Sequence, residues 1–288
     1  MPQLPEQDNE AYVREVHDKG LAFDLGTMSR RRMLAVLGGA GAIAVAGGSL
    51  IGASGQAEAA AAACLAEVES ETAGPFPADG SNGPDVRVLS GIVRSDIRPS
   101  FGTSTTVATG VLLQFSLTIN NLACTPLAGA AVYAWHCDKL GRYSLYSSGA
   151  TTQNYLRGIQ VADSTGKVTF TTIYPAAYTG RWPHIHFEVY SSLSNATSGA
   201  GPIRKTSQIA LPEAESKLVY ASSYGYTGST ANMRRTTLAS DMVFGDDLAA
   251  REMATLTGSV AAGYVANLTI TVDPTDSELA GGASRLSA

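Results

Sequence analysis

From about residue 87 onward, the chain alternates between short apolar runs and polar breaks. The runs are enriched in β-branched and aromatic residues, and clusters of Gly, Pro, Asn and Ser separate them. This pattern is typical of strands joined by turns. We therefore expect strands over six segments, which are residues 111–119, 130–136, 168–173, 184–190, 207–211 and 264–272.

Helical patterns are rare by comparison. Residues 212–221 and 246–256 are the two segments that we expect to be helical, and both are short. Residues 163–166 (Asp-Ser-Thr-Gly) predict a hairpin turn, whereas 121–126 and 175–183 are expected to be loops near strand ends, where functional groups often lie. Many short strands with few helices predict an all-β protein, a β-sandwich of mostly antiparallel strands with long loops.

The first 59 residues do not continue this pattern. Residues 29–34 (Ser-Arg-Arg-Arg-Met-Leu) have the form of a twin-arginine export signal, residues 33–57 carry no charge, and Ala-Glu-Ala at 57–59 is a small-x-small cleavage pattern. We therefore predict that residues 1–59 are a leader removed on export by the twin-arginine route, which would make the protein extracellular or attached to the cell surface. Residues 60–288 would form one domain with a flexible C-terminal tail from about 275.

Two alternatives to simple cleavage stay open. The uncharged run is long enough to span a bilayer as a retained anchor, although its glycines make it weakly hydrophobic. Residues 61–64 (Ala-Ala-Ala-Cys) could instead be a lipoprotein cleavage site at Cys64, although the leucine usual before the small residues is missing. After cleavage of the leader, we expect no stable membrane span.

Composition excludes some functions. The chain has 288 residues, of which 44% are hydrophobic, enough for a sizeable core. Its net charge is -5 and it has no basic tract beyond residues 30–32, which argues against binding nucleic acid. An oxidising destination permits a disulfide among the 3 cysteines. Cys124 and Cys137 flank a predicted strand and should lie near its opposite ends, so we favour Cys64–Cys124 and leave Cys137 free.

The candidate chemistry starts from a histidine pair, His184-Ile-His186, in a chain with only 4 histidines. Positions i and i+2 of a strand lie on the same face, so both imidazoles can reach one metal ion. A plain strand with two satisfied histidines is an equally good interpretation of the pair alone. A zinc site would need a third ligand, for which His136 and Cys137 are conceivable donors.

Tyrosines are the other donors near the pair. Tyr143 follows Gly-Arg, and Tyr178 follows Pro-Ala-Ala in the loop before the histidines. Each could also be a core aromatic residue, which is the usual place of tyrosine in a sandwich. The residues alone therefore leave a metal site and an ordinary core both open.

The same residues resemble a known family, the intradiol ring-cleavage dioxygenases, which includes catechol and protocatechuate 3,4-cleaving enzymes. The resemblance covers roughly residues 70–275 and is closest to the exported, single-domain branch, because the helical dimerisation segment of the cytoplasmic catechol enzymes has no counterpart here. The matching segments are 71–76 (ETAGPF), 126–138 (PLAGAAVYAWHCD), 141–144 (GRYS), 155–158 (YLRG), 173–178 (IYPAAY) and 180–187 (GRWPHIHF).

The resemblance implies a non-haem Fe(III) cofactor. Its ligands would be Tyr143, Tyr178, His184 and His186, and Tyr178 matches the tyrosinate that leaves the iron when substrate binds. Among the remaining matches, Arg181 is the arginine three residues before the first histidine, Gln208 is a glutamine beside the substrate, and Gly74 and Pro75 would line the substrate cleft.

Elementary chemistry agrees with this donor set. Ferric iron is a hard ion for which anionic oxygen donors are suitable, and coordination deprotonates a phenol whose free pKa is about 10. The always cationic Arg181 would stabilise negative charge that develops on the substrate ring. We therefore predict an enzyme that cleaves catechols, such as those from lignin or plant phenolics, with O2 to muconate-type diacids.

Other functions and assemblies are kept as alternatives. The histidine pair could serve a zinc-dependent hydrolase, or the sandwich could be a non-enzymatic, transthyretin-like binding module. We expect small-molecule partners, catechol and O2, rather than nucleic acid. A homodimer formed through a sheet edge stays an option.

Overall fold

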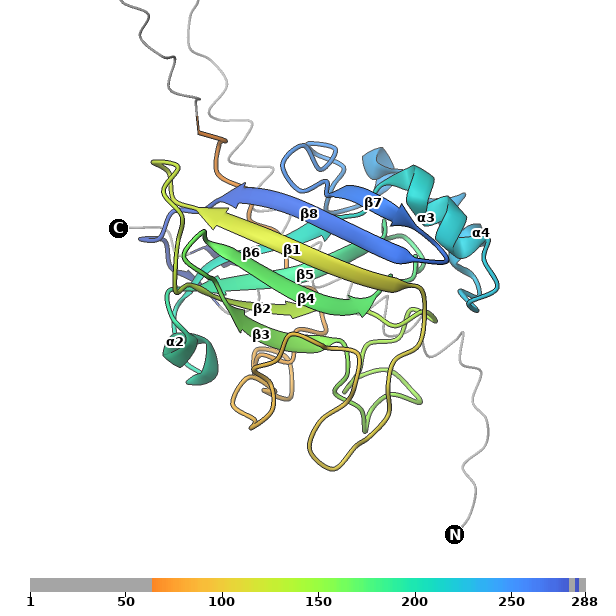
Figure 1. Ribbon diagram of the computed structural model, residues 1–288, viewed down its shortest axis with the longest axis horizontal. Helices are drawn as coiled ribbons and strands as arrows, with labels where there is room; N and C mark the ends of the chain where they lie inside the picture. The colour runs from red at the N-terminus through yellow and green to blue at the C-terminus, as the bar shows by residue number, and fades with distance from the viewer. Residues whose placement is uncertain (1–63, 280–282, 285–288) are drawn as a thin grey trace, which may run out of the picture.

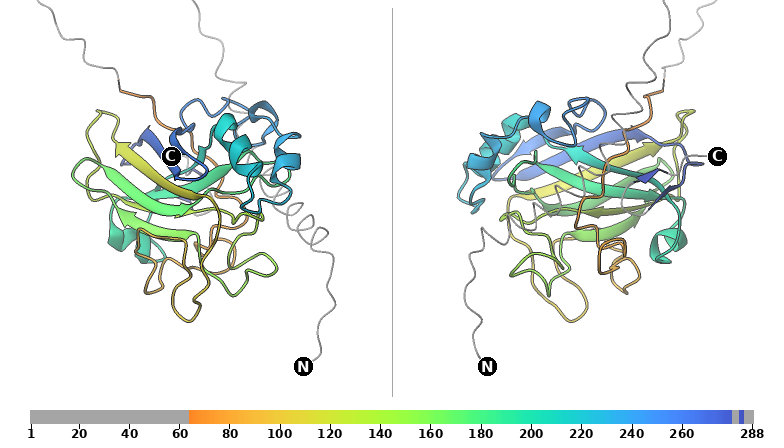
Figure 2. Two further views of the ribbon diagram at one scale, coloured as in Figure 1. Left: turned by 45° about the vertical axis from the view of Figure 1, so that its right-hand side comes forward. Right: turned by 180° about the vertical axis from the view of Figure 1, so that it is seen from behind.

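The computed structural model describes residues 64–279 and 283–284. Within these residues the strands form two sheets, one of four strands and one of six, that pack face to face as two layers (Figures 1 and 2). Only short helices accompany them. The predicted all-β sandwich is confirmed.

The four-stranded sheet has the order β4-β1-β8-β7. Its strands are β1 (Leu112–Asn120), β4 (Lys167–Ile173), β7 (Thr255–Ser259) and β8 (Gly263–Thr271). β1 pairs antiparallel with β4, β7 pairs antiparallel with β8, and β1 pairs parallel with β8. The sheet is therefore mostly antiparallel, as expected. Alternate residues of β1, such as Leu113 and Phe115, are buried, because successive side chains of a strand point to opposite faces.

The six-stranded sheet has the order β10-β9-β6-β5-β2-β3. Its strands are β2 (Ala131–Trp135), β3 (Arg157–Val161), β5 (His184–Tyr190), β6 (Ile203–Ala210), β9 (Glu278–Leu279) and β10 (Ala283–Ser284). β5 lies between β2 and β6, and all seven of its residues are buried. The histidine pair therefore begins a strand that is covered on both faces.

The helices lie at the two ends of the sandwich. α3 (Glu213–Tyr220) and α4 (Ser229–Met233) are at one end, followed by a 3-10 turn, η1 (Leu238–Ser240), and α2 (Leu193–Thr197) is at the other (Figures 1 and 2). The helix predicted over 212–221 is thus confirmed as α3. α2, α4 and η1 were not expected, and each is five residues or shorter.

The helix predicted over 246–256 is wrong. Turns occupy most of this segment, and β7 begins at Thr255. Leu248 and Ala249 have φ angles of 62° and 56°, in the left-handed region that a right-handed helix cannot contain. The Leu, Ala, Glu and Met content suggested a helix, but the tertiary structure requires a tight turn here.

The turn at 163–166 has the expected chemistry but a different role. Asp163 Oδ1 accepts hydrogen bonds from the backbone N–H groups of Thr165 and Lys167, as turn aspartates do. However, the strands that it joins, β3 and β4, belong to different sheets. The segment is therefore a crossing between the two layers and does not close a hairpin. β3 itself was not predicted.

Beyond residue 275, β9 joins the six-stranded sheet, and residues 280–282 and 285–288 of the predicted flexible tail lie outside the described residues. Glu278 in β9 pairs with Ile203 of β6. Its Oε2 atom accepts a hydrogen bond of 2.7 Å from the backbone N–H of Thr206, and its side chain is buried. β9 and β10 thereby extend the six-stranded sheet beyond β6.

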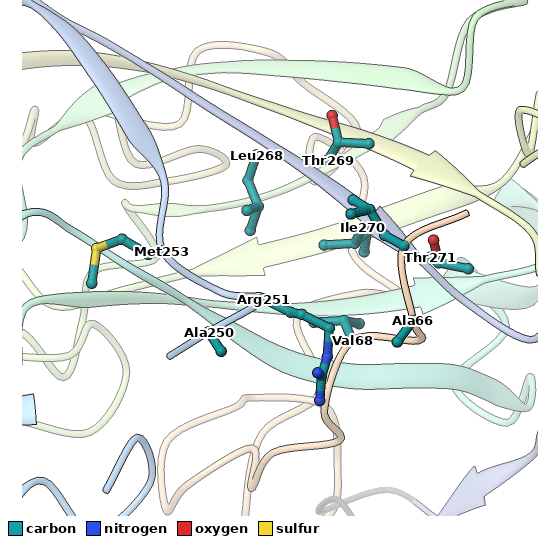
Figure 3. Close-up of a pocket in the computed structure, with 10 residues that line it drawn as sticks. Ala66, Val68, Ala250, Arg251, Met253, Leu268, Thr269, Ile270 and Thr271 are labelled. Atoms are coloured by element: carbon teal, nitrogen blue, oxygen red, sulfur yellow. The ribbon is translucent and has the colours of Figure 1, made fainter. Parts of the chain in front are cut away.

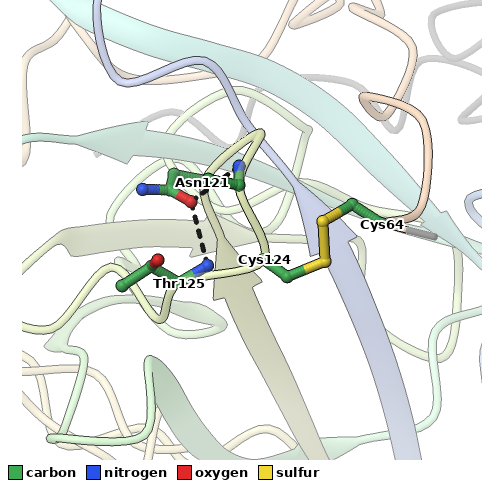
Figure 4. Close-up of a disulfide and its surroundings, with 5 residues drawn as sticks. Cys64, Asn121, Cys124 and Thr125 are labelled. Carbon is green, nitrogen blue, oxygen red and sulfur yellow. Dashed lines mark hydrogen bonds between the residues drawn. A yellow bond between two sulfur atoms is a disulfide. The ribbon is translucent and has the colours of Figure 1, made fainter. Parts of the chain in front are cut away.

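A disulfide joins Cys64 to Cys124, as favoured from the sequence, and Cys137 is a buried free thiol (Figure 4). The side chain of Asn121 accepts hydrogen bonds from the N–H groups of Ala123 and Thr125 and so shapes the loop that presents Cys124. A sulfur atom bonded in this way is not free to carry a lipid. The predicted leader, residues 1–59, lies outside the described residues, and the helices in the described part are all too short and polar to cross a membrane.

A pocket lies where the segment after Cys64 packs on β8 (Figure 3). Its lining includes Ala66, Val68, Met253 and Ile270, with Arg251 at its side. None of its lining residues is among the predicted site residues.

Candidate metal centre

β5 and its neighbours build one wall of the candidate site. His184 and His186 lie on the same face of β5 and are 2% and 3% exposed. In the register of the sheet, Trp135 of β2 and Gln208 of β6 lie directly opposite His186 on either side. The Trp135 ring stacks on the His186 ring at a centroid distance of 5.0 Å and an angle of 4°. The strand pairing therefore fixes the histidine pair from both sides.

Tyr143 comes from the loop between β2 and β3, and the residues on either side of it are anchored. On one side, Asp138 accepts hydrogen bonds from the N–H and Nε of Arg142. On the other side, Arg157 donates from Nε to Ser144 Oγ and from Nη2 to the Ser144 carbonyl, both at 3.0 Å. These bonds hold the backbone next to Tyr143 and so orient its phenol. Asp138 also accepts from the Leu140 N–H and is thus a turn residue.

Tyr178 comes from the loop between β4 and β5, which α3 and α4 support. Tyr220 of α3 donates to the Pro175 carbonyl, and Asn232 of α4 donates to the Ala177 carbonyl. Gly141 lies against Tyr178: a Cβ at Gly141 would be 3.2 Å from the Tyr178 Cβ. Two separate loops therefore bring the tyrosines to the histidines.

The four predicted ligand side chains converge on one point. The phenol oxygens of Tyr143 and Tyr178 and the Nε2 atoms of His184 and His186 form five pairs at 3.0–3.3 Å. Donor atoms that surround one metal ion at about 2 Å lie roughly 3 Å from one another, so this spacing fits a single ion. Tyr178 is partly exposed, whereas the other three side chains are buried.

The protonation states of the cluster suit a cation. His184 Nδ1 lies 2.5 Å from the Trp182 carbonyl, which can only accept, so the proton sits on Nδ1 and the Nε2 lone pair points to the cluster. Burial holds the pKa values of both histidines well below the ordinary value, and the nearby Arg181 adds to this effect. Burial raises the pKa of Tyr143 well above 10, and Tyr178 adds to the rise. A buried phenol of this kind ionises only when a cation compensates it.

Arg181 lies beside this cluster, buried, with its Nη1 atom 3.4 Å from His184 Nε2. Nε donates to Asp241 Oδ2 at 3.0 Å, and Nη2 donates to Gln208 Oε1 at 2.6 Å. Burial alone would lower the pKa of Arg181, but Asp241 and the phenol oxygens outweigh it and the pKa is raised. The arginine is therefore cationic at any working pH.

The predicted cleft residues are close to the same point. A Cβ at Gly74 would lie 3.5 Å from His186 Cε1, and its φ of +69° is one that glycine adopts readily. Gln208 Nε2 donates to the Thr72 carbonyl at 2.9 Å, which ties β6 to this N-terminal segment. Gly74 thus borders the donor cluster, and Pro75 follows it in the chain.

The donors considered for zinc are used elsewhere. His136 Nε2 lies 2.6 Å from Thr172 Oγ1, its Nδ1 lies 2.8 Å from the Cys137 carbonyl, and burial lowers its pKa to about 4. The Cys137 thiol donates to the Ala176 carbonyl. In the described part of the chain, no three His, Cys, Asp or Glu side chains are grouped so that they could hold a metal ion.

Sequence reasoning missed two residues of this region. Arg157 is fully buried and donates to the carbonyls of Phe76 and Pro77 as well as to Ser144. Asp241 is the acceptor for Arg181, sixty residues away. The position of Arg157 in the Leu-Arg-Gly motif could have pointed to its role. No local sequence pattern marks Asp241.

Comparisons with known proteins agree with this geometry. A family model described as Dioxygenase matches residues 95–194. A chlorocatechol 1,2-dioxygenase from Rhodococcus opacus is 32% identical over 69 residues, which span 24% of this chain and about a quarter (27%) of that relative. An intradiol ring-cleavage dioxygenase structure from Tetranychus urticae superposes with a TM-score of 0.59 at 23% identity, covering 74% of this chain and 98% of that one.

The sandwich with its convergent tyrosines and histidines has the fold of a ring-cleavage dioxygenase. The matched family model and this fold agree with the resemblance to intradiol ring-cleavage dioxygenases that the motifs indicated. Members of this family are oxidoreductases that typically use Fe(III).

Proposed function

We propose that this protein is an exported Fe(III) intradiol dioxygenase that cleaves the ring of catechols with O2 and gives muconate-type diacids. The observation that carries the proposal is the convergence of two phenol oxygens and two imidazole nitrogens within 3.0–3.3 Å of one another. Tyr143, Tyr178, His184 and His186 are the residues that would hold the iron.

The donor set favours a trivalent ion. Phenolates are hard, anionic oxygen donors, and the two imidazoles present neutral lone pairs. When bound, ferric iron would withdraw electron density from a chelated catecholate and make its ring reactive toward O2. Trp135 and the β5 pairing hold the imidazoles rigid, so the ligands require little rearrangement on binding.

Tyr178 is the ligand suited to leave when substrate arrives. It is the partly exposed member of the cluster and lies on a loop, whereas both histidines lie in a central strand. Its phenolate oxygen can then accept a proton from the incoming catechol. Tyr143 is buried and anchored on both sides, so it would remain in place.

Arg181 and Gln208 would face the bound ring. The guanidinium can stabilise negative charge on the ring, because it is buried, cationic and directed at the donor cluster. Gln208 holds the guanidinium by one hydrogen bond and Thr72 by another, and so closes the site near Gly74 and Pro75.

Export is part of this proposal. Twin-arginine export carries proteins that have already folded, which suits an enzyme that must acquire iron first. The Cys64–Cys124 disulfide supports an oxidising destination, because disulfides are rare in cytosolic proteins. Cell fractionation of the full-length protein, with a twin-lysine variant of residues 31–32 as the control, tests the route.

The activity is tested on purified, iron-loaded protein. Tyrosinate ligation should give a visible charge-transfer absorption, and anaerobic catechol should shift it. Admission of O2 should then consume one O2 per catechol and yield a muconate-type diacid. Tyr178→Phe and His184→Ala should lose this activity, while Tyr224→Phe, an exposed tyrosine outside the cluster, should keep it.

The same measurements separate the alternatives. A colourless protein with one iron per chain would contradict tyrosinate ligation. A zinc hydrolase would retain its metal in Tyr143→Phe and Tyr178→Phe, and a binding module would show no O2 uptake with any catechol. Either result would refute the proposed function.

A further inference from the structure

Asp241 forms an unusually complete set of hydrogen bonds for a residue outside the donor cluster. It follows η1 directly, and its side chain is fully buried. Oδ2 accepts from Arg181 Nε at 3.0 Å and from the Trp182 N–H at 2.6 Å. Oδ1 accepts from the N–H groups of Val243 and Phe244 at 2.8 and 3.0 Å. One carboxylate therefore ties the turn at 241–244 to the segment just before the histidine pair.

These bonds determine where the Arg181 guanidinium points. The group is planar, so holding Nε and Nη2 defines the position of Nη1 as well. Asp241 holds Nε and Gln208 holds Nη2, and the remaining Nη1 is then 3.4 Å from His184 Nε2. Without the Nε bond, rotation about the side-chain torsions would be limited by Gln208 alone.

The same turn also covers the guanidinium. The N–H bonded by Asp241 belongs to Phe244, whose ring centroid lies 5.8 Å from Arg181 Cζ and 6.4 Å from the centroid of the His184 ring. Phe244 is fully buried. The carboxylate thus places both the counter-charge and the aromatic cover of the arginine.

The Arg181 guanidinium also requires a counter-charge in this position. Arg181 is buried, so a guanidinium without a counter-charge would be costly here. Asp241 is the carboxylate that pairs with it, at 3.0 Å. The other polar partner of the guanidinium, Gln208, is uncharged.

We propose that Asp241 is a positioning residue of the ring-cleavage site, which acts through Arg181 by aiming its guanidinium at the substrate ring. This inference rests on the proposed function. Asp241 would not bind iron or substrate itself, so its loss should impair the reaction of the bound catechol with O2 far more than iron binding. Loss of the Asp241 carboxylate would also release the backbone N–H of Phe244 and shift its ring.

The test is a double-mutant cycle with Asp241→Asn and Arg181→Met in iron-loaded protein. Asp241→Asn alone should lower kcat at least about tenfold, which corresponds to about 1.4 kcal/mol, with a smaller change in KM. The charge-transfer absorption and the anaerobic catechol affinity should stay close to wild type. In the Arg181→Met background, Asp241→Asn should change kcat less than about twofold. Asp246→Asn, an exposed aspartate of the same segment, is the matched control and should behave as wild type.

Stability gives a readout that does not depend on activity. If the pair is formed as described, the melting temperatures of the single and double variants should be non-additive, the double losing less than the sum of the two singles. Multiplicative kcat losses in an active wild type would overturn the positioning role, as would loss of colour in Asp241→Asn. If the wild-type protein is inactive but the melting temperatures of its variants are non-additive, the proposed function is refuted, and the catalytic role of Asp241 with it.

Discussion

Glu252 is a buried acid whose ionisation should control the stability of the fold. It is fully buried in the segment before β7, and Ser207 Oγ donates to its Oε1 atom at 3.0 Å. Burial raises its pKa from 4.5 to about 8; the Ser207 bond opposes the rise, and the nearby Asp247 and Asp246 add to it. The folded protein therefore holds this side chain as the neutral acid at pH 7.

The direction of the pH effect follows from proton binding. Below pH 4.5 the acid is protonated in the folded and unfolded states alike, and its full contribution to stability is present. Between pH 4.5 and about 8 only the folded state keeps the proton, so stability falls as pH rises, by about 1.4 kcal/mol per pH unit. From pH 5.5 to 7.5 the loss from this group is about 3 kcal/mol as an upper bound.

Glu252→Gln removes the titration and keeps the shape. Chemical unfolding of wild type and variant at half-unit steps from pH 5 to 8 should show curves that diverge, with the variant gaining in relative stability as pH rises. Glu213→Gln on the exposed face of α3 serves as the control, and its curve should run parallel to wild type. Parallel curves for Glu252→Gln would show that this carboxyl is ionised in the folded protein and would refute the reasoning.

Two further predictions concern cross-links and loop geometry. Replacing Cys64 and Cys124 by Ala should lower the free energy of unfolding by about 4 kcal/mol, because the disulfide closes a loop with a separation of 60 residues, and denaturant titration measures this. Gly141→Ala should destabilise by about 1–2 kcal/mol because φ is +79°, and its Cβ would also press on Tyr178 and shift the charge-transfer absorption. Gly102→Ala, with φ of +76° and open space around it, should show only the loss of stability.

The parts of the fold that could be predicted from sequence are those that period and composition control. The strand at 184–190 was predicted with its observed bounds, because all of its residues except Glu188 are β-branched, aromatic or histidine, and Pro183 precedes it. Its period of two also gave the shared face of His184 and His186. The pairing of that strand with β2 and β6 depends on contacts between distant segments, which local patterns do not carry.

The missed elements have identifiable physical causes. β3 begins with Arg157 and Gly158, residue types that rarely mark a strand. It was missed because its arginine is buried through hydrogen bonds rather than through apolar contacts. The false helix at 246–256 has good helical composition, yet left-handed residues interrupt it. Asp241 was missed for a third reason, since its partner Arg181 is adjacent to it only in the folded chain.

The tyrosines were found through motif resemblance, and charge balance explains why they matter. Arg181 and Asp241 form a buried pair that contributes no net charge, and the two imidazoles are neutral. A ferric ion in this setting must therefore be compensated by its own ligands: two phenolates supply two negative charges and a hydroxide would supply the third. A divalent ion with the two phenolates and the hydroxide would leave one excess negative charge in a buried site, which is costly. As ligands in the proposed site, Tyr143 and Tyr178 would favour the ferric state, whereas the histidines would serve several metals equally well.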